Sequence, residues 1–368
     1  MNRVSQVIIV ISTFVLCNEA YSQYEFFNEK RIETTEVKSQ DITGTCWSFS
    51  TASFIESELL RQGKGSYDLS EMFVVRSIYK DKARNYMLRQ GEANFSQGAL
   101  AHDLIRAYEM HGAMPESVYS GLINSDTTHN HSELESGLKG YLDGVSKGRK
   151  LSDRWSVAFG GVLDAYLGKV PEKFEYKGKS YTPESFANSL GIKANEYVSL
   201  TSFTHHPYYS DFILEIPDNY SNGSFVNITL DELVATVDNA IEKGYSLAWD
   251  GDVSEKTFKM KEGLAILPKD PKRDSLYVIP GEEIVVNSAI RQTNFENLST
   301  TDDHLMHLVG IAQDENGVKY YIIKNSWGER GHFKGYLYMS EAYFRMKTIG
   351  ILMHKDALPK EITKKINE

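Results

Sequence analysis

The sequence around a cysteine, a histidine and an asparagine in this chain is typical of a thiol nucleophile and its base. Cys46 stands at the start of a predicted helix, because the apolar residues from Trp47 to Leu60 recur at helical spacing and Gly63 ends the pattern. A cysteine attacks as its thiolate, which a helix N-terminus stabilises by about 0.3–1 kcal/mol. Since a shift of one pKa unit requires ~1.36 kcal/mol, the helix alone is insufficient and a histidine must assist.

His304 is the histidine best placed to serve as that base. It opens a predicted strand, residues 305–312, which an Asn-Gly turn connects to a second strand, residues 318–324. His307 differs from His304 by an odd number of positions, so it faces the opposite side of the sheet and is predicted to pack. Asn325 ends the return strand, and its amide oxygen is expected to accept the imidazole N–H of His304.

Four other histidines occur as close pairs in polar stretches: His129 with His131, and His205 with His206. Neither pair forms a recognised metal-ligand motif, so these residues are predicted to be solvated. The sequence therefore predicts no metal and no cofactor.

The first 22 residues have the features of a signal peptide. Arg3 precedes a mostly apolar run from Val7 to Leu16, and small residues at Ala20 and Ser22 predict cleavage before Gln23. The run is too short for a membrane span, which needs about 20 residues. An uncleaved anchor and a lipoprotein signal at Cys17 remain alternatives. Removal of the signal predicts a secreted or periplasmic protein without a membrane segment.

The same cleavage would leave a single cysteine. The chain contains two, Cys17 and Cys46, so a mature chain starting at Gln23 could form no internal disulfide. Taken by itself, Cys46 is best interpreted as a buried free cysteine.

The composition is that of a globular protein. The chain has 368 residues, of which 41% are hydrophobic, 12% aromatic and 24% charged, and this balance excludes a disordered or collagen-like chain. The formal net charge of −10 argues against a nucleic-acid-binding protein, which normally has a basic surplus.

Helical patterns concentrate in the first half and strand patterns in the second, which predicts an α+β fold with two lobes. Residues 28–39 are polar and predicted to be an irregular lead-in. A helical insertion is expected at about residues 125–200, within a single domain from 23 to 368. Besides the helix after Cys46, the pattern predicts helices after Ser70 and at 97–110, 155–167 and 183–190, with further strands at 245–249 and 335–339.

Three segments resemble a known family. The run Gln40-Asp41-Ile42-Thr43-Gly44-Thr45-Cys46-Trp47-Ser48-Phe49 resembles the nucleophile segment of papain-like cysteine peptidases. Asp303-His304 and Asn325-Ser326-Trp327-Gly328 resemble the histidine and asparagine segments of that family, in the same chain order, and the resemblance extends from about Gln40 to the C-terminus.

The resemblance implies a papain-like fold, with a helical lobe carrying the nucleophile and an antiparallel β lobe carrying histidine and asparagine. It assigns Cys46 as the nucleophile, His304 as the base and then the acid, and Asn325 as the residue that orients His304. Gln40 would stabilise the oxyanion together with the backbone N–H of Cys46, and Trp327 would cover the His304–Asn325 bond. The implied substrate is a peptide or protein.

Two departures point to one branch of the family. Thr43 stands where secreted papain-like enzymes usually have a disulfide cysteine, and His304 lies 258 residues after Cys46 rather than the usual ~130–150. Both departures, together with residues 162–174 and 328–337, resemble the bleomycin hydrolase and aminopeptidase C branch. That branch is mostly cytoplasmic, so a signal peptide departs from it. The resemblance also allows a homo-oligomer.

Three questions of function stay open at this point. One is whether the chain cuts peptides or is a catalytically weak peptide-binding member of the family. Another is whether it is instead an acyl transferase of the transglutaminase type. The last is where a substrate is cut. Aminopeptidases of this branch hold the substrate amino group with a C-terminal arm, whereas residues 355–368 resemble the last helix and then stop, which favours an open cleft with endopeptidase activity. Asp250 or Asp252 is an alternative anchor for an amino group.

Overall fold

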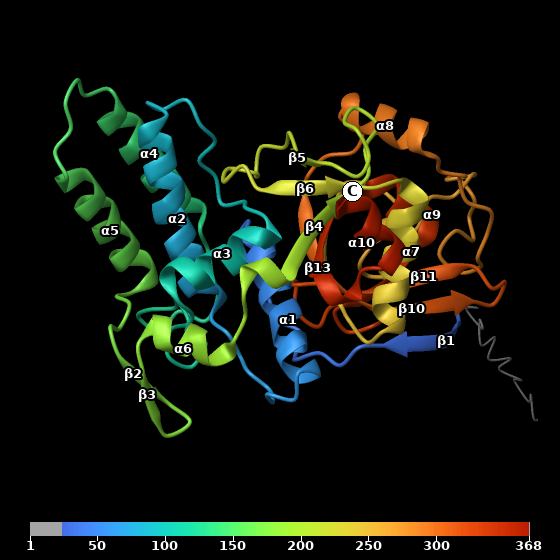
Figure 1. The fold of residues 1–368 in the computed structure, drawn as a ribbon, viewed down its shortest axis with the longest axis horizontal. Helices are drawn as coiled ribbons and strands as arrows, with labels where there is room; N and C mark the ends of the chain where they lie inside the picture. The colour runs from blue at the N-terminus through green and yellow to red at the C-terminus, as the bar shows by residue number, and fades with distance from the viewer. Residues whose placement is uncertain (1–23, 368) are drawn as a thin grey trace, which may run out of the picture.

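Helices gather on one side of the molecule and a large sheet on the other, with helix α1 (Cys46–Arg61) between them (Figure 1). The computed structural model describes residues 24–367, so the predicted signal peptide, residues 1–22, lies outside the described residues. The helices and strands agree with the predicted α+β class.

The helical lobe is built from residues 46–196. Its elements, in chain order, are α1 (Cys46–Arg61), α2 (Glu71–Leu88), α3 (Ala101–His111), α4 (Ser132–Ser146), α5 (Arg154–Leu167), the small hairpin β2 (Phe174–Tyr176) and β3 (Lys179–Tyr181), α6 (Pro183–Leu190) and a 3-10 turn, η1 (Ala194–Glu196). Residues 125–200, where the insertion is predicted, supply α4, α5, the hairpin and α6. α5 packs against both α2 and α4.

Capping side chains determine where these helices begin. Ser70 Oγ accepts the N–H of Phe73 at 3.0 Å, which confirms the predicted start of α2. The third helix begins at Ala101, four residues later than predicted, because the Asp103 carboxylate accepts the N–H of Leu100 at 3.1 Å.

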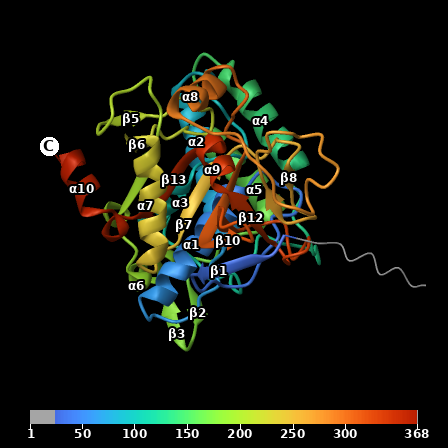
Figure 2. The ribbon, with the colours of Figure 1, turned by 90° about the vertical axis from the view of Figure 1, so that its right-hand side faces the viewer.

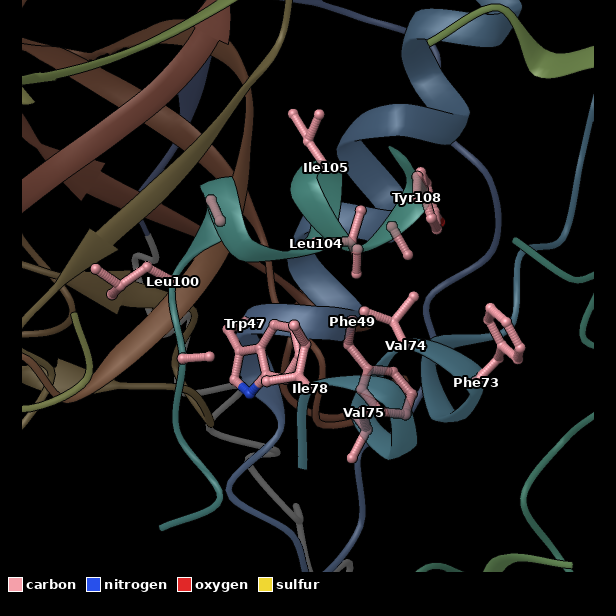
Figure 3. Packing of buried hydrophobic residues seen from close by; sticks show 14 of the residues in the cluster. Trp47, Phe49, Phe73, Val74, Val75, Ile78, Leu100, Leu104, Ile105 and Tyr108 are labelled. Carbon is pink, nitrogen blue, oxygen red and sulfur yellow. The ribbon is translucent and has the colours of Figure 1, made fainter. Parts of the chain in front are cut away.

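The first turn of α1 is set in a rigid apolar core. Trp47 and Phe49 from α1 pack among side chains of α2 and α3, and Trp47 is fully buried (Figure 3). The indole N–H of Trp47 donates to the carbonyl of Gln97 at 2.9 Å, which connects the start of α1 to the segment before α3. A close-packed interior permits little movement, so this core fixes the position of Cys46 at the start of α1.

The second lobe is one eleven-stranded sheet with the order β5-β6-β4-β13-β7-β10-β11-β12-β9-β8, and β1 pairs with β10. Most pairs are antiparallel, as predicted, but β4 pairs with β6 and β9 with β12 in parallel, so the sheet is mixed. Its strands are β1 (Phe26–Arg31), β4 (Tyr197–Thr201), β5 (Asp211–Ile213), β6 (Ser224–Asn227), β7 (Leu247–Gly251), β8 (Phe258–Lys259), β9 (Leu264–Ala265), β10 (His304–Asp314), β11 (Lys319–Lys324), β12 (Tyr336–Ser340) and β13 (Thr348–His354).

The lead-in was predicted to be irregular, and this is wrong for its first part. Residues up to Arg31 belong to β1, which pairs with β10 around a register shift between Phe27 and Lys30. The polar side chains of Asn28 and Glu29 are exposed at this edge of the sheet, so the strand lacks a clear apolar alternation.

The remaining helices belong to the second lobe: α7 (Leu230–Glu242), α8 (Ser288–Glu296), α9 (Glu341–Lys347) and α10 (Lys360–Asn367), with the 3-10 turn η2 (Lys355–Ala357). α7 and α10 cover the same side of the sheet (Figures 1 and 2). No helix within residues 24–367 is both long enough and apolar enough for a membrane span.

The two lobes meet where α1 packs against β10. Ser53 of α1 bonds His307 Nδ1 at 2.9 Å and accepts from Lys324 Nζ at 2.8 Å. His307 is fully buried, as its predicted packing role requires. This contact places the N-terminus of α1 next to the first residue of β10.

Candidate active site

Cys46 is the first residue of α1 and lines a cleft of ≈ 570 Å³ between the lobes. The residue before it, Thr45, starts the helix without a side-chain cap, although its carbonyl accepts the N–H of Ser48 at 2.9 Å. N–H groups at a helix start have no partner within the helix, so the backbone N–H of Cys46 is available to a ligand. Cys46 as a whole residue is 8% exposed.

His304, the first residue of β10, lines the same cleft from the second lobe. Its Nε2 lies 2.8 Å from Asn325 Oδ1, the bond that the sequence predicts. Asn325 Oδ1 is held in turn by the N–H of Ser326 at 2.7 Å. Because an amide oxygen can only accept, this bond requires a proton on Nε2 and leaves Nδ1 as the nitrogen that can take one.

Trp327 lies against this pair, as predicted. Its ring centre is 4.8 Å from that of His304, with 31° between the planes. The ring excludes water from one side of the imidazole, and His304 and Asn325 are 4% and 2% exposed. In this dry setting a hydrogen bond is stronger than in water.

Gln40 also lines the cleft, held there by hydrogen bonds to Ser326 and Thr43. Its Oε1 accepts from Ser326 Oγ at 2.7 Å, its backbone N–H donates to the Ser326 carbonyl at 2.8 Å, and its Nε2 donates to the Thr43 carbonyl at 2.6 Å. An amide nitrogen carries two hydrogens, so one remains for a substrate oxygen. No sequence signal indicated that Ser326 would orient Gln40.

The closed site favours neutral forms of the reacting pair. Burial raises the pKa of the Cys46 thiol to about 12, and the acidic side chains of Asp302, Asp250 and Asp218 add to that rise. Burial lowers the pKa of His304 to about 4, although its bond to Asn325 opposes the shift. At neutral pH these groups are therefore a thiol and a neutral imidazole.

The two aspartates considered as amino-group anchors are both buried, so neither is a solvated turn residue. Asp252 accepts from Ser254 and from the N–H of Thr301, and Lys347 Nζ lies 3.4 Å from it, so its charge is balanced inside the protein. Asp250 has no such partners and lies beside Asp302.

The predicted exposure of the histidine pairs is wrong for His129 and His131, which are buried at 9% and 2% exposure. His131 Nδ1 bonds the Tyr79 hydroxyl at 3.1 Å. Burial lowers the pKa of His131 to about 4, so it is neutral.

His205, His206 and Glu215 come together with their ligand atoms within 4.8 Å of one another, the spacing of a metal site. The hydrogen bonds around these three residues favour a state without a metal. Gln292 Oε1 accepts from the N–H of Thr204 at 2.6 Å, which fixes the amide so that its Nε2 donates to His205 Nδ1 at 2.9 Å. The proton of a neutral His205 is then on Nε2, where it donates to Glu215 at 3.2 Å and blocks a metal.

The cleft also contains residues that the sequence analysis missed. They are Asn94, Ser96, Gln97, Gly98 and Glu135 from the helical lobe, and Asp218 and Asp302 from the second lobe. Asp302 could have been suspected from its place two residues before His304. No sequence signal identifies Asp218, because the loop after β5 brings it to the cleft.

Comparison with protein-family models gives two matches. The model described as the Peptidase C1-like family matches residues 165–368, and the model described as the papain family cysteine protease matches residues 23–99. The second match contains Gln40 and Cys46, and the first contains His304 and Asn325.

Comparison with known proteins gives relatives of similar length. The chain is 24% identical over 379 residues to aminopeptidase G of Lactobacillus delbrueckii subsp. lactis, covering 90% of this chain and 83% of the relative. It is 24% identical over 387 residues to aminopeptidase C of Lactobacillus helveticus, covering 92% and 83%. Among solved structures, PepW from Lactobacillus rhamnosis HN001 superimposes with a TM-score of 0.76 at 19% identity, covering 94% of this chain and 85% of that one. This likeness establishes a shared fold.

Proposed function

Because this chain belongs to the Peptidase C1-like family, and is thus a cysteine peptidase, we propose that it hydrolyses peptide bonds with Cys46 as nucleophile and His304 as base. The observation that carries this proposal is the His304–Asn325 bond of 2.8 Å, in a cleft that also contains Cys46 at a helix N-terminus. The hydrogen bond holds the histidine base in place, and the helix N-terminus stabilises the thiolate. These are the two forms of assistance that a thiol nucleophile needs.

In the proposed reaction, His304 Nδ1 takes the thiol proton as Cys46 Sγ attacks the substrate carbonyl carbon. The carbonyl oxygen becomes an oxyanion, which the backbone N–H of Cys46 and the free N–H of Gln40 Nε2 stabilise. His304 then gives its proton to the leaving amine, and the C–N bond breaks to leave a thioester. A water molecule, deprotonated by His304, hydrolyses the thioester, releases the carboxylic acid and restores the thiol.

Asn325 contributes by fixing the ring of His304. Its Oδ1 accepts the Nε2–H bond in every step, and this bond strengthens when the ring becomes an imidazolium. Asn325 does not line the cleft, so it acts through His304 rather than on the substrate.

Removal of the thiol tests the proposal. We expect Cys46→Ala to abolish hydrolysis of fluorogenic peptides and to leave the melting temperature nearly unchanged. Ser50→Ala, one turn further along α1, serves as the matched control and should retain activity. Iodoacetamide should label Cys46 and inactivate the enzyme in parallel. Turnover by Cys46→Ala above a few per cent would contradict the mechanism, as would amide transfer to an added amine in preference to hydrolysis.

Two modes of cleavage are proposed for this site. Relatives with aminopeptidase names favour removal of amino-terminal residues. Internal cleavage is favoured by the position of α10, because none of its described residues lines the cleft; Thr363, Ile366 and Asn367 instead line a separate hollow with Tyr197. One peptide amide compared with a free and an acetylated amino terminus separates the modes, since only internal cleavage survives acetylation.

We also propose that the enzyme acts outside the cytoplasm, in the periplasm or the medium. The support is the apolar run from Val7 to Leu16 with small residues before Gln23. Amino-terminal sequencing of the protein from its native source should begin at Gln23, and a sequence beginning at Met1 would contradict export by this signal.

A further inference from the structure

The cleft around Cys46 has a strongly acidic wall. Four carboxylates line it, those of Glu135, Asp218, Asp302 and Asp303, and none of the described lining residues is lysine or arginine. Glu135 is engaged by Gln97 Nε2 at 2.6 Å. Asp303 is exposed and accepts from Thr301 Oγ1 at 2.7 Å. Asp218 and Asp302 are the carboxylates without a comparable partner.

Asp218 lies directly over Gly98 on the opposite lobe. A Cβ atom at Gly98 would be 1.7 Å from Asp218 Oδ2, so only glycine permits this approach. The other oxygen, Oδ1, receives only long bonds from Ser96 at 3.4 Å and Asn94 at 3.3 Å. Oδ2 receives no hydrogen bond from any residue between 24 and 367. The nearby ammonium of Lys82 is fully buried and is bonded to the Gly98 carbonyl and to Ser96.

Asp302 is backed by a second, more deeply buried carboxyl. Asp250, on β7, is 5% exposed, and neither of its oxygens receives a hydrogen bond; the same is true of Asp302 Oδ2. The two carboxyls are close enough to share a proton. Burial and the adjacent Asp302 raise the pKa of Asp250 well above its usual value, so Asp250 holds that proton and donates it. Burial and the charge of Asp218 also raise the pKa of Asp302, to about 7, so Asp302 presents its negative charge to the cleft above that pH.

Asp218 and Asp302 are half-buried, but the Oδ2 atom of Asp302 is enclosed without a hydrogen-bond donor. Such an atom is costly unless a partner supplies the missing charge and hydrogen bonds. The partner these residues fit is a cation with several N–H donors, namely an ammonium or a guanidinium group. A carboxylate would be repelled, so the carboxyl-terminal end of a short peptide does not suit this wall.

We propose that Asp218 and Asp302 bind a cationic group of the substrate, on the amino-terminal side of the bond that is cut. This deepens the proposed function and rests on it. One source of the cation is the α-amino group of a substrate cut after its first residue. The other is the side chain of a lysine or arginine one residue further from the cut. Both present the same chemistry to the two carboxylates.

Four fluorogenic aminomethylcoumarin amides distinguish these sources. They are leucine, acetyl-leucine, acetyl-lysyl-leucine and acetyl-norleucyl-leucine, where norleucine is the uncharged counterpart of lysine. kcat/KM is measured for wild type, Asp302→Asn and Asp218→Asn. The control is Asp153→Asn, which makes the same change in net charge at an exposed position before α5. Melting temperatures identify any variant that fails to fold, in which case the other variant decides.

We expect Asp302→Asn and Asp218→Asn to lower kcat/KM for a cationic substrate roughly 10- to 100-fold, the worth of a charge-assisted hydrogen bond. The uncharged substrates should change less than threefold. A loss confined to leucine amide identifies the α-amino group, and a loss confined to the lysyl substrate identifies the side chain. Equal losses on all four substrates, or no loss on any, would overturn the proposal. The proposed function fails separately if unmodified wild type hydrolyses none of the four, although Cys46 of the same preparation reacts with iodoacetamide.

Discussion

Asn325→Ala is the change that most directly tests the arrangement of the site. The Oδ1 atom of Asn325 accepts two hydrogen bonds, from His304 Nε2 at 2.8 Å and from the Ser326 N–H at 2.7 Å. Alanine removes both. The bond to His304 gains strength when the ring becomes an imidazolium, because a hydrogen bond to a charged group is worth about 1.5–3 kcal/mol.

A loss of that size corresponds to a fall in kcat/KM of roughly 10- to 100-fold. The fall should appear in kcat, since Asn325 is 2% exposed and does not line the cleft, so substrate binding and KM should change little. The Ser326 N–H loses its acceptor as well, so the free energy of unfolding should fall by about 1–3 kcal/mol.

The assay pairs steady-state kinetics on a fluorogenic peptide with a thermal melt. Asn239→Ala is the matched control, because it removes a 2.6 Å bond from Asn239 Nδ2 to the Ala357 carbonyl, remote from the cleft. It should lower stability without changing kcat. In a His304→Ala background, Asn325→Ala should have no further effect on the rate. A kcat within twofold of wild type, or an equal fall in the control, would refute an orienting role for Asn325.

Two further predictions concern the same residues. Burial lowers the pKa of His304 to about 4 and raises that of Cys46 to about 12. The active pair keeps one proton between these values, so kcat/KM for an uncharged substrate such as the acetyl-leucine amide should be flat from about pH 5 to pH 8, and an acid limb near pH 6.5 on that substrate would contradict this. Gln40→Ala removes an oxyanion donor and should lower kcat about 100- to 1,000-fold, whereas Ser326→Ala, which only loosens Gln40, should have a smaller effect.

The elements that carry the catalytic residues could be predicted from the sequence because their signals are local. Apolar spacing predicted α1, and Cys46 is indeed its first residue. The Asn-Gly turn predicted the β10–β11 hairpin, and Asp314 Oδ1 closes that turn by accepting from Asn316 and Val318. The His304–Asn325 hydrogen bond could be predicted because this hairpin brings the two residues together and an amide oxygen accepts an imidazole N–H.

Features that depend on distant parts of the chain could not be predicted. Residues 28–31 are polar and belong to strand β1 only because β10 offers an edge to them. His131 is in a polar stretch of sequence, yet Tyr79 and the helical core bury it. Asp218 reaches the cleft only through the loop after β5, and nothing near it in sequence indicates chemistry. The local periodicity of apolar residues does not reveal contacts between segments that are distant in the sequence.

The acidic wall also affects the nucleophile, and this gives a prediction with opposite signs for two measurements. Burial is the largest cause of the raised pKa of Cys46, and the negative charge of Asp302 and its neighbours adds to it because it opposes the thiolate. Asp302→Asn removes one of these charges, so the neutral reagent iodoacetamide should alkylate Cys46 faster than in wild type at pH 8. Turnover of the cationic substrate should become slower in the same variant. If Asp302 merely supported the structure, both rates would fall together, so a slower alkylation would refute the electrostatic reasoning. The opposite changes would mean that the carboxylates disfavour the free thiolate, and that a bound cation relieves this effect when the substrate is in place.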